Sequence, residues 1–331
     1  MNEFSYARPA TIDDALALLQ SHRDAPQEQA VLAGGTDLLT LVKGSISTPR
    51  QLVDIKRLPE LDSQISMTDD GLRIGALATL AQLEDDPLVL DVHPALAQAA
   101  AVAATPQLRH MATIGGNLLQ QPRCWYYRSH DVSCWRKGGD SCPAADPQGE
   151  NQYHALFGDG PCYAVHPSDP ATALLALAAR VRVRDSRGER SIPLDEFFTL
   201  PTDDHRQETV LTPGSLITAI EIPAAAPTTR SVYLKAMDRA VWAFALVGAA
   251  AQVAVEDGIV TSARLVLGGV APIPWRVPAA EAVLIGNAAT PEVFSHAAGI
   301  ALQDAHPLAK NGYKIDLAKR LLERALTQAT A

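Results

Sequence analysis

The chain has 331 residues, enough for about two domains, and 47% of them are hydrophobic, so the sequence excludes a disordered or fibrous protein. Its formal net charge is −9 without long runs of like charge, which argues against nucleic acid as a partner. Residues 1–6 have neither the basic nor the apolar part of an export signal, and the most apolar stretch, 241–254, is too short for a transmembrane segment.

The first hundred residues predict alternating strands and helices. Thr11 and Asp14 have the spacing of a capping box, and the apolar residues after them predict a helix. An apolar run over 29–33, the turn 34–37 and a segment over 38–43 predict strand, glycine turn and short helix. The next predicted elements are a strand over 51–55, a hairpin of 64–67 with 72–75, and an alanine-rich helix over 94–104.

Residues 120–161 are rich in Gly, Pro, Cys, Trp and Tyr and show neither helical nor strand periodicity. A connection of about 40 residues is far longer than usual, so we expect it to be functional, disordered or held by bound groups. All four cysteines fall within it or just after it: Cys124, Cys134, Cys142 and Cys162. Their clustering indicates two disulfides, a zinc site or an iron–sulfur cluster. Zinc is less favoured because the closely spaced cysteine pair of most zinc sites is missing.

The remainder of the chain predicts two further groups of elements. The first consists of a strand over 162–165, a buried helix over 170–179, a hairpin of 180–184 with 190–192, and a strand over 216–222. A domain boundary is predicted at 223–227, where proline and alanine dominate. The second group consists of strands over 232–236, 244–255 and 259–270, which predict a small antiparallel sheet, and two or three helices after them.

Two segments place paired glycines beside a small polar residue: LAGGTDL over 32–38 and TIGGNL over 113–118. Without Cβ atoms, the backbone can approach a ligand closely, and successive N–H groups can bind an anion such as pyrophosphate. Neither segment matches the dinucleotide fingerprint or the phosphate-binding loop of nucleoside triphosphatases. From the residues alone, two tight turns that only reverse the chain remain an alternative.

With these two segments, the sequence resembles the FAD-binding subunit of the molybdenum hydroxylases, the family of xanthine dehydrogenase, carbon monoxide dehydrogenase and aldehyde oxidoreductases. The resemblance covers nearly the whole chain and includes Ser168, Asp169, Lys235, ITAIEIP over 217–223 and LGGVAPIPWR over 267–276. It implies an α+β fold. A PCMH-type FAD-binding domain of two subdomains would cover 1–225, and a smaller α+β domain, similar to the C-terminal domain of the carbon monoxide dehydrogenase flavoprotein, would cover 228–331.

Position by position, the resemblance implies FAD contacts in several parts of the chain. Asp169 would hold ribityl or ribose hydroxyls, the Ile217 backbone would meet the adenine side, and Lys235 would lie near the flavin ring. No catalytic residue is expected, because substrate oxidation would occur on a partner subunit. The residues expected around the FAD pyrophosphate are Val31, Leu32, Ala33, Gly34, Gly35, Thr36, Asp37 and Leu38 from the first segment, with Thr113, Ile114, Gly115, Gly116 and Asn117 from the second.

Within the family, the segment at about 120–162 resembles a cysteine-rich insertion of the periplasmic aldehyde oxidoreductase flavin subunit, and a related insertion occurs in 4-hydroxybenzoyl-CoA reductase. Both insertions hold a [4Fe–4S] cluster. The resemblance therefore makes Cys124, Cys134, Cys142 and Cys162 its thiolate ligands, and four metal bonds would order a segment that has little apolar periodicity. The expected shell of the cluster is Trp125, Tyr126, Tyr127 and Trp135, whereas His110, His130, His154 and His166 are expected to be surface or hydrogen-bonding residues.

The resemblance implies an electron-transfer function. Substrate would be oxidised at a molybdenum cofactor in a large partner subunit, and electrons would cross [2Fe–2S] clusters in a small partner to FAD here and then to an external acceptor. It further implies an aldehyde oxidoreductase exported to the periplasm with a signal-bearing partner, the cytoplasm being the alternative. The sequence is also compatible with the flavin subunit of a 4-hydroxybenzoyl-CoA reductase or xanthine dehydrogenase-type enzyme, with a free-standing PCMH-type FAD oxidase, and with a disulfide-linked binding module that has no cofactor.

Overall fold

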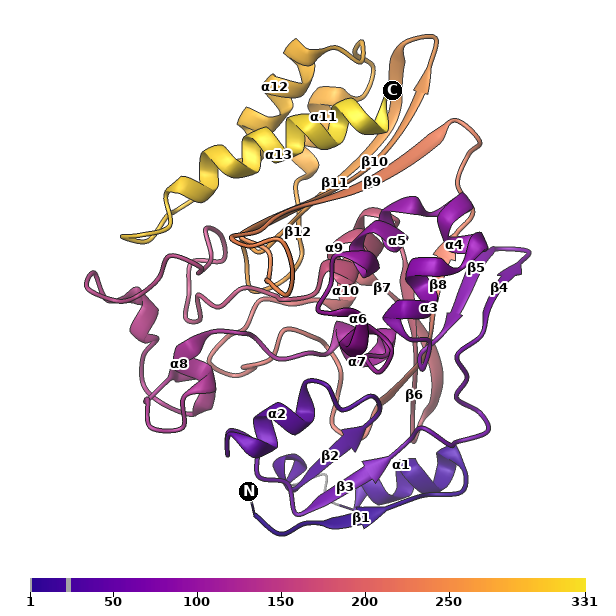
Figure 1. Ribbon diagram of the computed structural model, residues 1–331, viewed down its shortest axis with the longest axis vertical. Helices are drawn as coiled ribbons and strands as arrows, with labels where there is room; N and C mark the ends of the chain where they lie inside the picture. The colour runs from indigo at the N-terminus through magenta and orange to yellow at the C-terminus, as the bar shows by residue number, and fades with distance from the viewer. Residues whose placement is uncertain (1, 22–24) are drawn as a thin grey trace.

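The computed structural model describes residues 2–21 and 25–331. Three sheets follow one another along the long axis of the molecule, with the N-terminal sheet at one end and the C-terminal sheet at the other (Figure 1). The cysteine-rich segment projects to one side of the central sheet. The expected α+β architecture is confirmed.

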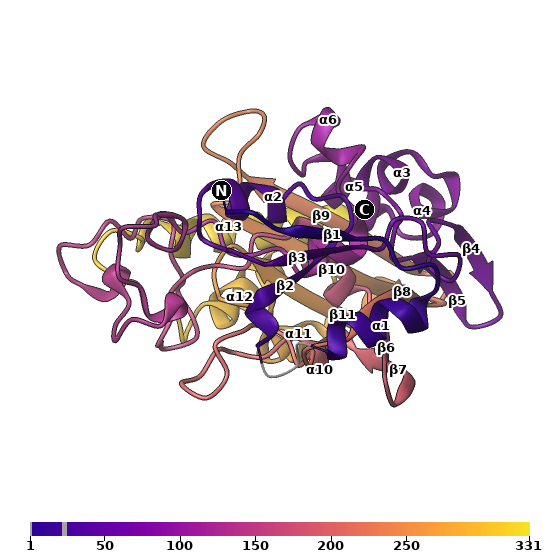
Figure 2. The same cartoon turned by 90° about the horizontal axis from the view of Figure 1, so that it is seen from below.

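The N-terminal sheet contains three parallel strands in the order β1-β3-β2, and Figure 2 views the molecule from this end. The first helix begins at the predicted capping box, where the Asp14 N–H donates to Thr11 Oγ1 at 3.1 Å and the Thr11 N–H donates to Asp14 Oδ2 at 3.2 Å. The elements are β1 (Ser5–Ala7), α1 (Ile12–Gln20), η1 (Pro26–Glu28), β2 (Gln29–Leu32), α2 (Leu38–Lys43) and β3 (Gln51–Asp54).

The central sheet is antiparallel, in the order β4-β5-β8-β6-β7, and both predicted hairpins are present in it as β4–β5 and β6–β7. Its strands are β4 (Ile65–Thr68), β5 (Gly71–Gly75), β6 (Arg180–Asp185), β7 (Gly188–Pro193) and β8 (Leu216–Pro223). Its helices are α3 (Leu80–Asp85), α4 (Pro87–Val92), α5 (Pro94–Ala101), α6 (Pro106–Arg109), α7 (Ile114–Leu118), α9 (Asp169–Ala176) and α10 (Leu194–Phe197).

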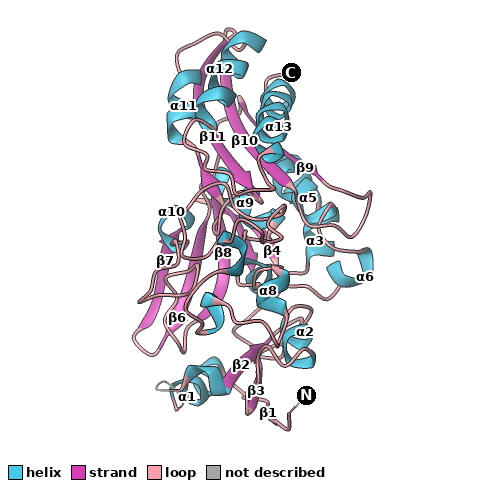
Figure 3. Ribbon diagram, turned by 90° about the vertical axis from the view of Figure 1, so that its left-hand side faces the viewer, coloured by secondary structure: helices cyan, strands magenta, loops and turns pink. Residues whose placement is uncertain are grey.

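The C-terminal sheet is antiparallel, in the order β12-β11-β10-β9, and three helices follow it as predicted (Figure 3). Side chains alternate between its two faces: Ala250 and Val266 join the core of the central domain, whereas Leu265 and Leu267 join the core with α11, α12 and α13. One face of the sheet therefore packs against the central domain, and the other packs against the three C-terminal helices. Its elements are β9 (Thr229–Ala236), β10 (Val247–Glu256), β11 (Ile259–Gly268), β12 (Trp275–Arg276), α11 (Pro278–Leu284), α12 (Pro291–Ala301) and α13 (Tyr313–Ala329).

The segment 120–161 is irregular, as predicted, and contains only three single-turn elements: α8 (Trp125–Arg128), η2 (Trp135–Lys137) and η3 (Pro143–Ala145). Hydrogen bonds from other parts of the chain hold it in place. Arg136 forms a buried ion pair with Glu208, and Trp135 Nε1 donates to Asp203 Oδ1 at 3.0 Å. No helix in the described part of the chain is long and apolar enough to span a membrane.

Two sequence predictions about local structure are wrong. Residues 162–165 form no strand, because Cys162 and Ala164 pack with Trp135 in a small core of the insertion instead of joining a sheet. The second glycine segment is not a loop. It forms α7, with Thr113 as its N-cap and Ile114 and Leu118 buried on one face, a spacing typical of a helix.

Candidate functional site

The first glycine segment forms the turn between β2 and α2. Gly35 has φ +71°, a left-handed conformation that glycine adopts without strain. At Gly34, a Cβ atom would lie 1.8 Å from the Met111 carbonyl oxygen. Since Met111 lies two residues before Thr113, where the second glycine segment begins, the two segments approach each other so closely that only glycine fits at position 34.

The two segments differ in the hydrogen-bonding state of their backbone N–H groups. In the second, the N–H groups of Gly115 and Gly116 donate to Ala76 O at 3.0 Å and Thr113 Oγ1 at 3.3 Å. In the first, the N–H groups of residues 34–37 donate to no other described residue. The expectation that both segments offer anion-binding N–H groups therefore needs correction: the first offers donors, and the second offers close approach of the backbone.

Between the two segments lies a cavity of about 290 Å³, here called the glycine cavity. Arg123 and Gln121 line it from the start of the insertion. Of the residues expected at FAD, those lining it are Val31, Ala33, Gly34, Gly35, Thr36, Asp37, Leu38, Thr113, Gly115, Gly116, Asn117 and Ile217. Leu32 and Ile114 do not line it, and Ile114 is fully buried in the central core.

Asp37 connects the first glycine segment to the insertion. Its carboxylate accepts hydrogen bonds from the Gln121 N–H at 2.8 Å and from Arg128 Nη2 at 2.7 Å, and it pairs with Arg123 at 3.0 Å. The two guanidinium groups neutralise this carboxylate beside the free N–H groups of residues 34–37. The wall of the glycine cavity is therefore suited to a ligand that carries negative charge.

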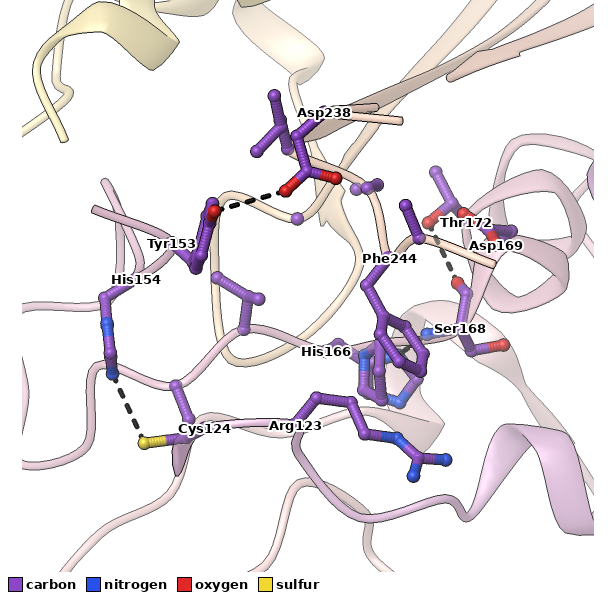
Figure 4. Close-up of a pocket in the computed structure, with 18 of the residues that line it drawn as sticks. Arg123, Cys124, Tyr153, His154, His166, Ser168, Asp169, Thr172, Asp238 and Phe244 are labelled. Carbon is purple, nitrogen blue, oxygen red and sulfur yellow. Dashed lines mark hydrogen bonds between the residues drawn. The ribbon is translucent and has the colours of Figure 1, made fainter. Parts of the chain in front are cut away.

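A second cavity, of about 200 Å³, lies on the other side of Arg123 and is here called the insertion cavity (Figure 4). Arg123 lines both cavities, and its guanidinium lies 4.9 Å from the centroid of the Phe244 ring. Cys124 and His154 lie on one side of the insertion cavity, and Ser168 and Asp169 lie across it. Residues 238–246, between β9 and β10, close a third side.

Asp169 and Lys235 are brought together as a buried ion pair, with Lys235 Nζ 2.8 Å from Asp169 Oδ2. Tyr233 donates its hydroxyl to Asp169 Oδ1 at 2.5 Å. Burial raises the pKa of Asp169, and the Lys235 ammonium opposes this rise. Asp169 lines the insertion cavity, whereas Lys235 lies behind it, bonded to Val102 O at 3.0 Å, and lines neither cavity.

The four cysteines are free thiols in the described structure, so no disulfide joins any two of them. Cys134 and Cys162 are buried, whereas Cys124 and Cys142 are half-buried. Burial raises the pKa of Cys124 to about 11 and that of Cys162 to about 12, and the charge of the neighbouring Cys142 raises both. Both groups are therefore protonated at neutral pH, and a metal would have to displace their protons.

No group of three or more His, Cys, Asp or Glu residues among those described is arranged to hold a metal ion. A [4Fe–4S] cluster instead distributes its four thiolates over four iron atoms. The segment contains four cysteines, which is the number of thiolates that such a cluster would require.

The insertion cavity is lined by Arg123, Trp125, His154 and His166, a placement that the sequence did not predict. His154 and His166 line it and are buried, and burial lowers the pKa of each to about 4, so both are neutral near pH 7. Arg123 Nε, Trp125 Nε1 and His154 Nδ1 are buried nitrogens without a hydrogen-bond partner among the described residues. Trp125 was expected in the shell of the cluster, whereas only its position beside Cys124 could have indicated Arg123 from the sequence.

These features define an α+β protein with a cysteine-rich segment and a cavity between two glycine segments, and the comparisons with known proteins identify it as a flavin-binding protein. A family described as the FAD binding domain in molybdopterin dehydrogenase matches residues 2–225, and the CO dehydrogenase flavoprotein C-terminal domain matches residues 232–329. The chain belongs to this family of FAD-binding proteins and is an oxidoreductase subunit of the molybdenum hydroxylases.

Individual relatives are similar over most or all of their length. The aldehyde oxidoreductase FAD-binding subunit PaoB of Escherichia coli is 39% identical over 100% of this chain and 99% of its own. The nicotinate dehydrogenase FAD-subunit of Eubacterium barkeri is 27% identical over 89% of this chain and 83% of its own. A chain in the solved carbon monoxide dehydrogenase from Hydrogenophaga pseudoflava has a TM-score of 0.78 at 29% identity, covering 99% of this chain and 97% of that one.

Proposed function

We propose that this chain is the FAD- and [4Fe–4S]-carrying electron-transfer subunit of a heterotrimeric, molybdenum-dependent aldehyde oxidoreductase. The observation that supports this most directly is the glycine cavity, with free N–H groups on one segment and a closely apposed second segment. The 39% identity to a subunit named as part of an aldehyde oxidoreductase favours aldehydes as the substrate class. FAD, when bound, would accept electrons from a partner and pass them to an external acceptor.

The two cavities suit different parts of an extended dinucleotide. The N–H groups of residues 34–37 would bind the pyrophosphate, with Ile217 on the adenine side of the glycine cavity. The molecule would pass Arg123 into the insertion cavity, where Asp169 would face the ribityl hydroxyls. Lys235 would then act on the flavin through Asp169, because it lies behind that carboxylate.

The four cysteines of the insertion would bind the [4Fe–4S] cluster, in agreement with the need of such a cluster for four thiolates. Changing Cys134→Ser would remove one ligand, and we expect the protein to lose most of its iron and acid-labile sulfide but to keep its FAD. Chemical analysis of wild-type and variant protein for iron, sulfide and flavin measures this. Full iron content in all four single serine variants would contradict the assignment of the cluster ligands.

The partners would be a large subunit with the molybdenum cofactor and a small subunit with [2Fe–2S] clusters, and the test uses the assembled complex. Under anaerobic conditions, an aldehyde should bleach the flavin absorption of the complex but not that of this chain alone. Reduction by xanthine, but not by any aldehyde, would favour a xanthine dehydrogenase-type enzyme. Electron flow toward a 4-hydroxybenzoyl-CoA thioester would favour the reductase, and turnover by the chain alone would favour an oxidase.

We also propose a periplasmic location, which the resemblance to the exported aldehyde oxidoreductases supports. The folded complex would cross the membrane with a partner that bears a twin-arginine signal. Cell fractionation with and without that partner's signal tests this. The protein should move to the cytoplasmic fraction when the signal is deleted, and a protein that remains periplasmic would contradict co-export.

A further inference from the structure

His154 lies between the insertion cavity and the cysteines. Its Nε2 atom is 3.2 Å from Cys124 Sγ, and both residues line the insertion cavity (Figure 4). The residue is buried, with 3% of its surface exposed. Its ring contacts those of Trp125 and Tyr126, with centroids 5.7 Å and 6.0 Å away. These contacts hold the imidazole in one orientation, with Nε2 toward the sulfur.

The backbone of His154 is fixed by the C-terminal domain. Its carbonyl oxygen accepts hydrogen bonds from Asn311 Nδ2 and Lys314 Nζ, each at 3.0 Å, and both donor residues are completely buried. Lys314 Nζ also donates to the carbonyl oxygens of Tyr153 at 2.9 Å and Gly269 at 2.8 Å. The position of His154 next to Cys124 is therefore set by the packing of two domains, which is what a defined hydrogen bond requires.

We propose that His154 is a positioning residue that donates a hydrogen bond from Nε2–H to the Cys124 sulfur of the [4Fe–4S] cluster and thereby raises its reduction potential. The inference rests on the proposed function, because it requires the cluster. With the proton on Nε2, Nδ1 is an acceptor, and it has no partner in the described part of the chain. The sequence predicts a surface or hydrogen-bonding histidine at position 154, and this proposal assigns the Cys124 sulfur as its hydrogen-bond partner.

The direction of the effect follows from charge. One-electron reduction adds negative charge to the cluster and its sulfur atoms, so an N–H donor stabilises the reduced form more than the oxidised form. A hydrogen bond to a charged acceptor changes an equilibrium constant by about tenfold. For a one-electron couple, a factor of ten corresponds to ~59 mV.

The test is a redox titration of the [4Fe–4S] signal by electron paramagnetic resonance at fixed pH, on the intact complex. His154→Phe keeps a planar ring but removes the donor. We expect the midpoint potential of the cluster in this variant to fall by ~59 mV, which corresponds to a tenfold change in the equilibrium constant of reduction. His154→Gln keeps an N–H group and should restore at least half of this shift. As a control, His93→Phe replaces a buried histidine whose ring nitrogens have no hydrogen-bond partner among the described residues, and it should leave the midpoint unchanged.

A wild-type midpoint in a His154→Phe complex that retains its iron would overturn the inference while leaving the cluster assignment intact. If His154→Phe loses its iron, pulsed resonance of wild-type complex with ¹⁵N-labelled histidine decides instead. The reduced cluster should then show coupling to a histidine nitrogen and an exchangeable proton, and absence of both couplings would overturn the inference. Wild-type complex that contains FAD but no iron in this subunit would overturn the cluster proposal and this inference together.

Discussion

Gly34 is the residue of the first glycine segment that lies against the backbone leading into the second. A side chain at this position would collide with the backbone carbonyl of Met111, which cannot move without displacing α7. The pair of glycines in the first segment could be predicted from the sequence as a backbone requirement. The partner of Gly34 could not, because Met111 is distant in the chain and only the fold brings it close.

We therefore expect Gly34→Ala to separate the two walls of the glycine cavity. Forcing an atom into a filled site typically costs about 1–3 kcal/mol, and FAD binding should weaken as the segments part. The measurements are the FAD content of the purified protein and its free energy of unfolding in urea. Gly299→Ala is the control, because a Cβ atom at Gly299 in α12 meets no atom within 4 Å. A Gly34→Ala protein with full FAD and unchanged stability would contradict this reading.

At the scale of elements, individual side chains of the neighbouring helices and loops hold the insertion in place through hydrogen bonds and ion pairs. Asp37, at the start of α2, binds the insertion through Gln121, Arg123 and Arg128. The capped helix α1, both hairpins and the C-terminal sheet could be predicted because their signals are local. The path of residues 120–168 could not be predicted. Its apolar residues pack with one another and with the cavity walls, and their spacing along the sequence is neither that of a helix nor that of a strand.

We expect Asp37→Asn to loosen the beginning of the insertion. Removing the carboxylate leaves two partly buried guanidinium groups without their ion-pair partner, at a cost of about 2 kcal/mol. Hydrogen exchange of the backbone amides over 121–128 should become faster. Asp131→Asn changes a carboxylate that is 96% exposed and should have no such effect. Equal exchange in Asp37→Asn and wild-type protein would show that Asp37 does not anchor the insertion.

At the scale of the whole molecule, buried histidines make folding sensitive to acid. Burial lowers the pKa of His93 to about 4, below the value of about 6.5 in an unfolded chain. The unfolded state therefore binds more protons than the folded state below pH 6.5. The contribution of neutral His93 to the unfolding free energy is complete above that pH and is lost as the pH falls toward 4. Both ring nitrogens of His93 lack a partner among the described residues, which leaves desolvation as the cause.

His93→Phe should remove the contribution of His93 to the pH dependence of the unfolding free energy. Between pH 7.5 and pH 5, wild-type protein should lose about 2 kcal/mol more of its unfolding free energy than the variant does. Urea denaturation at the two pH values measures the difference, and the cost of repacking cancels because it is the same at both. Parallel losses in the two proteins would show that His93 is already protonated in the folded state or is not buried in solution.

The cavities also belong to the whole molecule, since each is assembled from segments that are far apart in sequence. The two glycine segments, which the sequence predicted as ligand-binding, form the two facing walls of the glycine cavity. The insertion cavity could not be predicted, because residues 123–125, 153–154, 164–172 and 238–246 carry no shared motif and meet only in the fold. The same reason explains why His154 was not expected beside Cys124.

The most direct test of the account is the cofactor content of the purified native protein, from its anaerobic visible spectrum and from iron and acid-labile sulfide assays on the same sample. A subunit that carries both cofactors should show flavin absorption together with about four iron and four sulfide per chain. Flavin without iron would contradict the assignment of the four cysteines and leave the FAD subunit standing. A colourless protein would contradict the account as a whole.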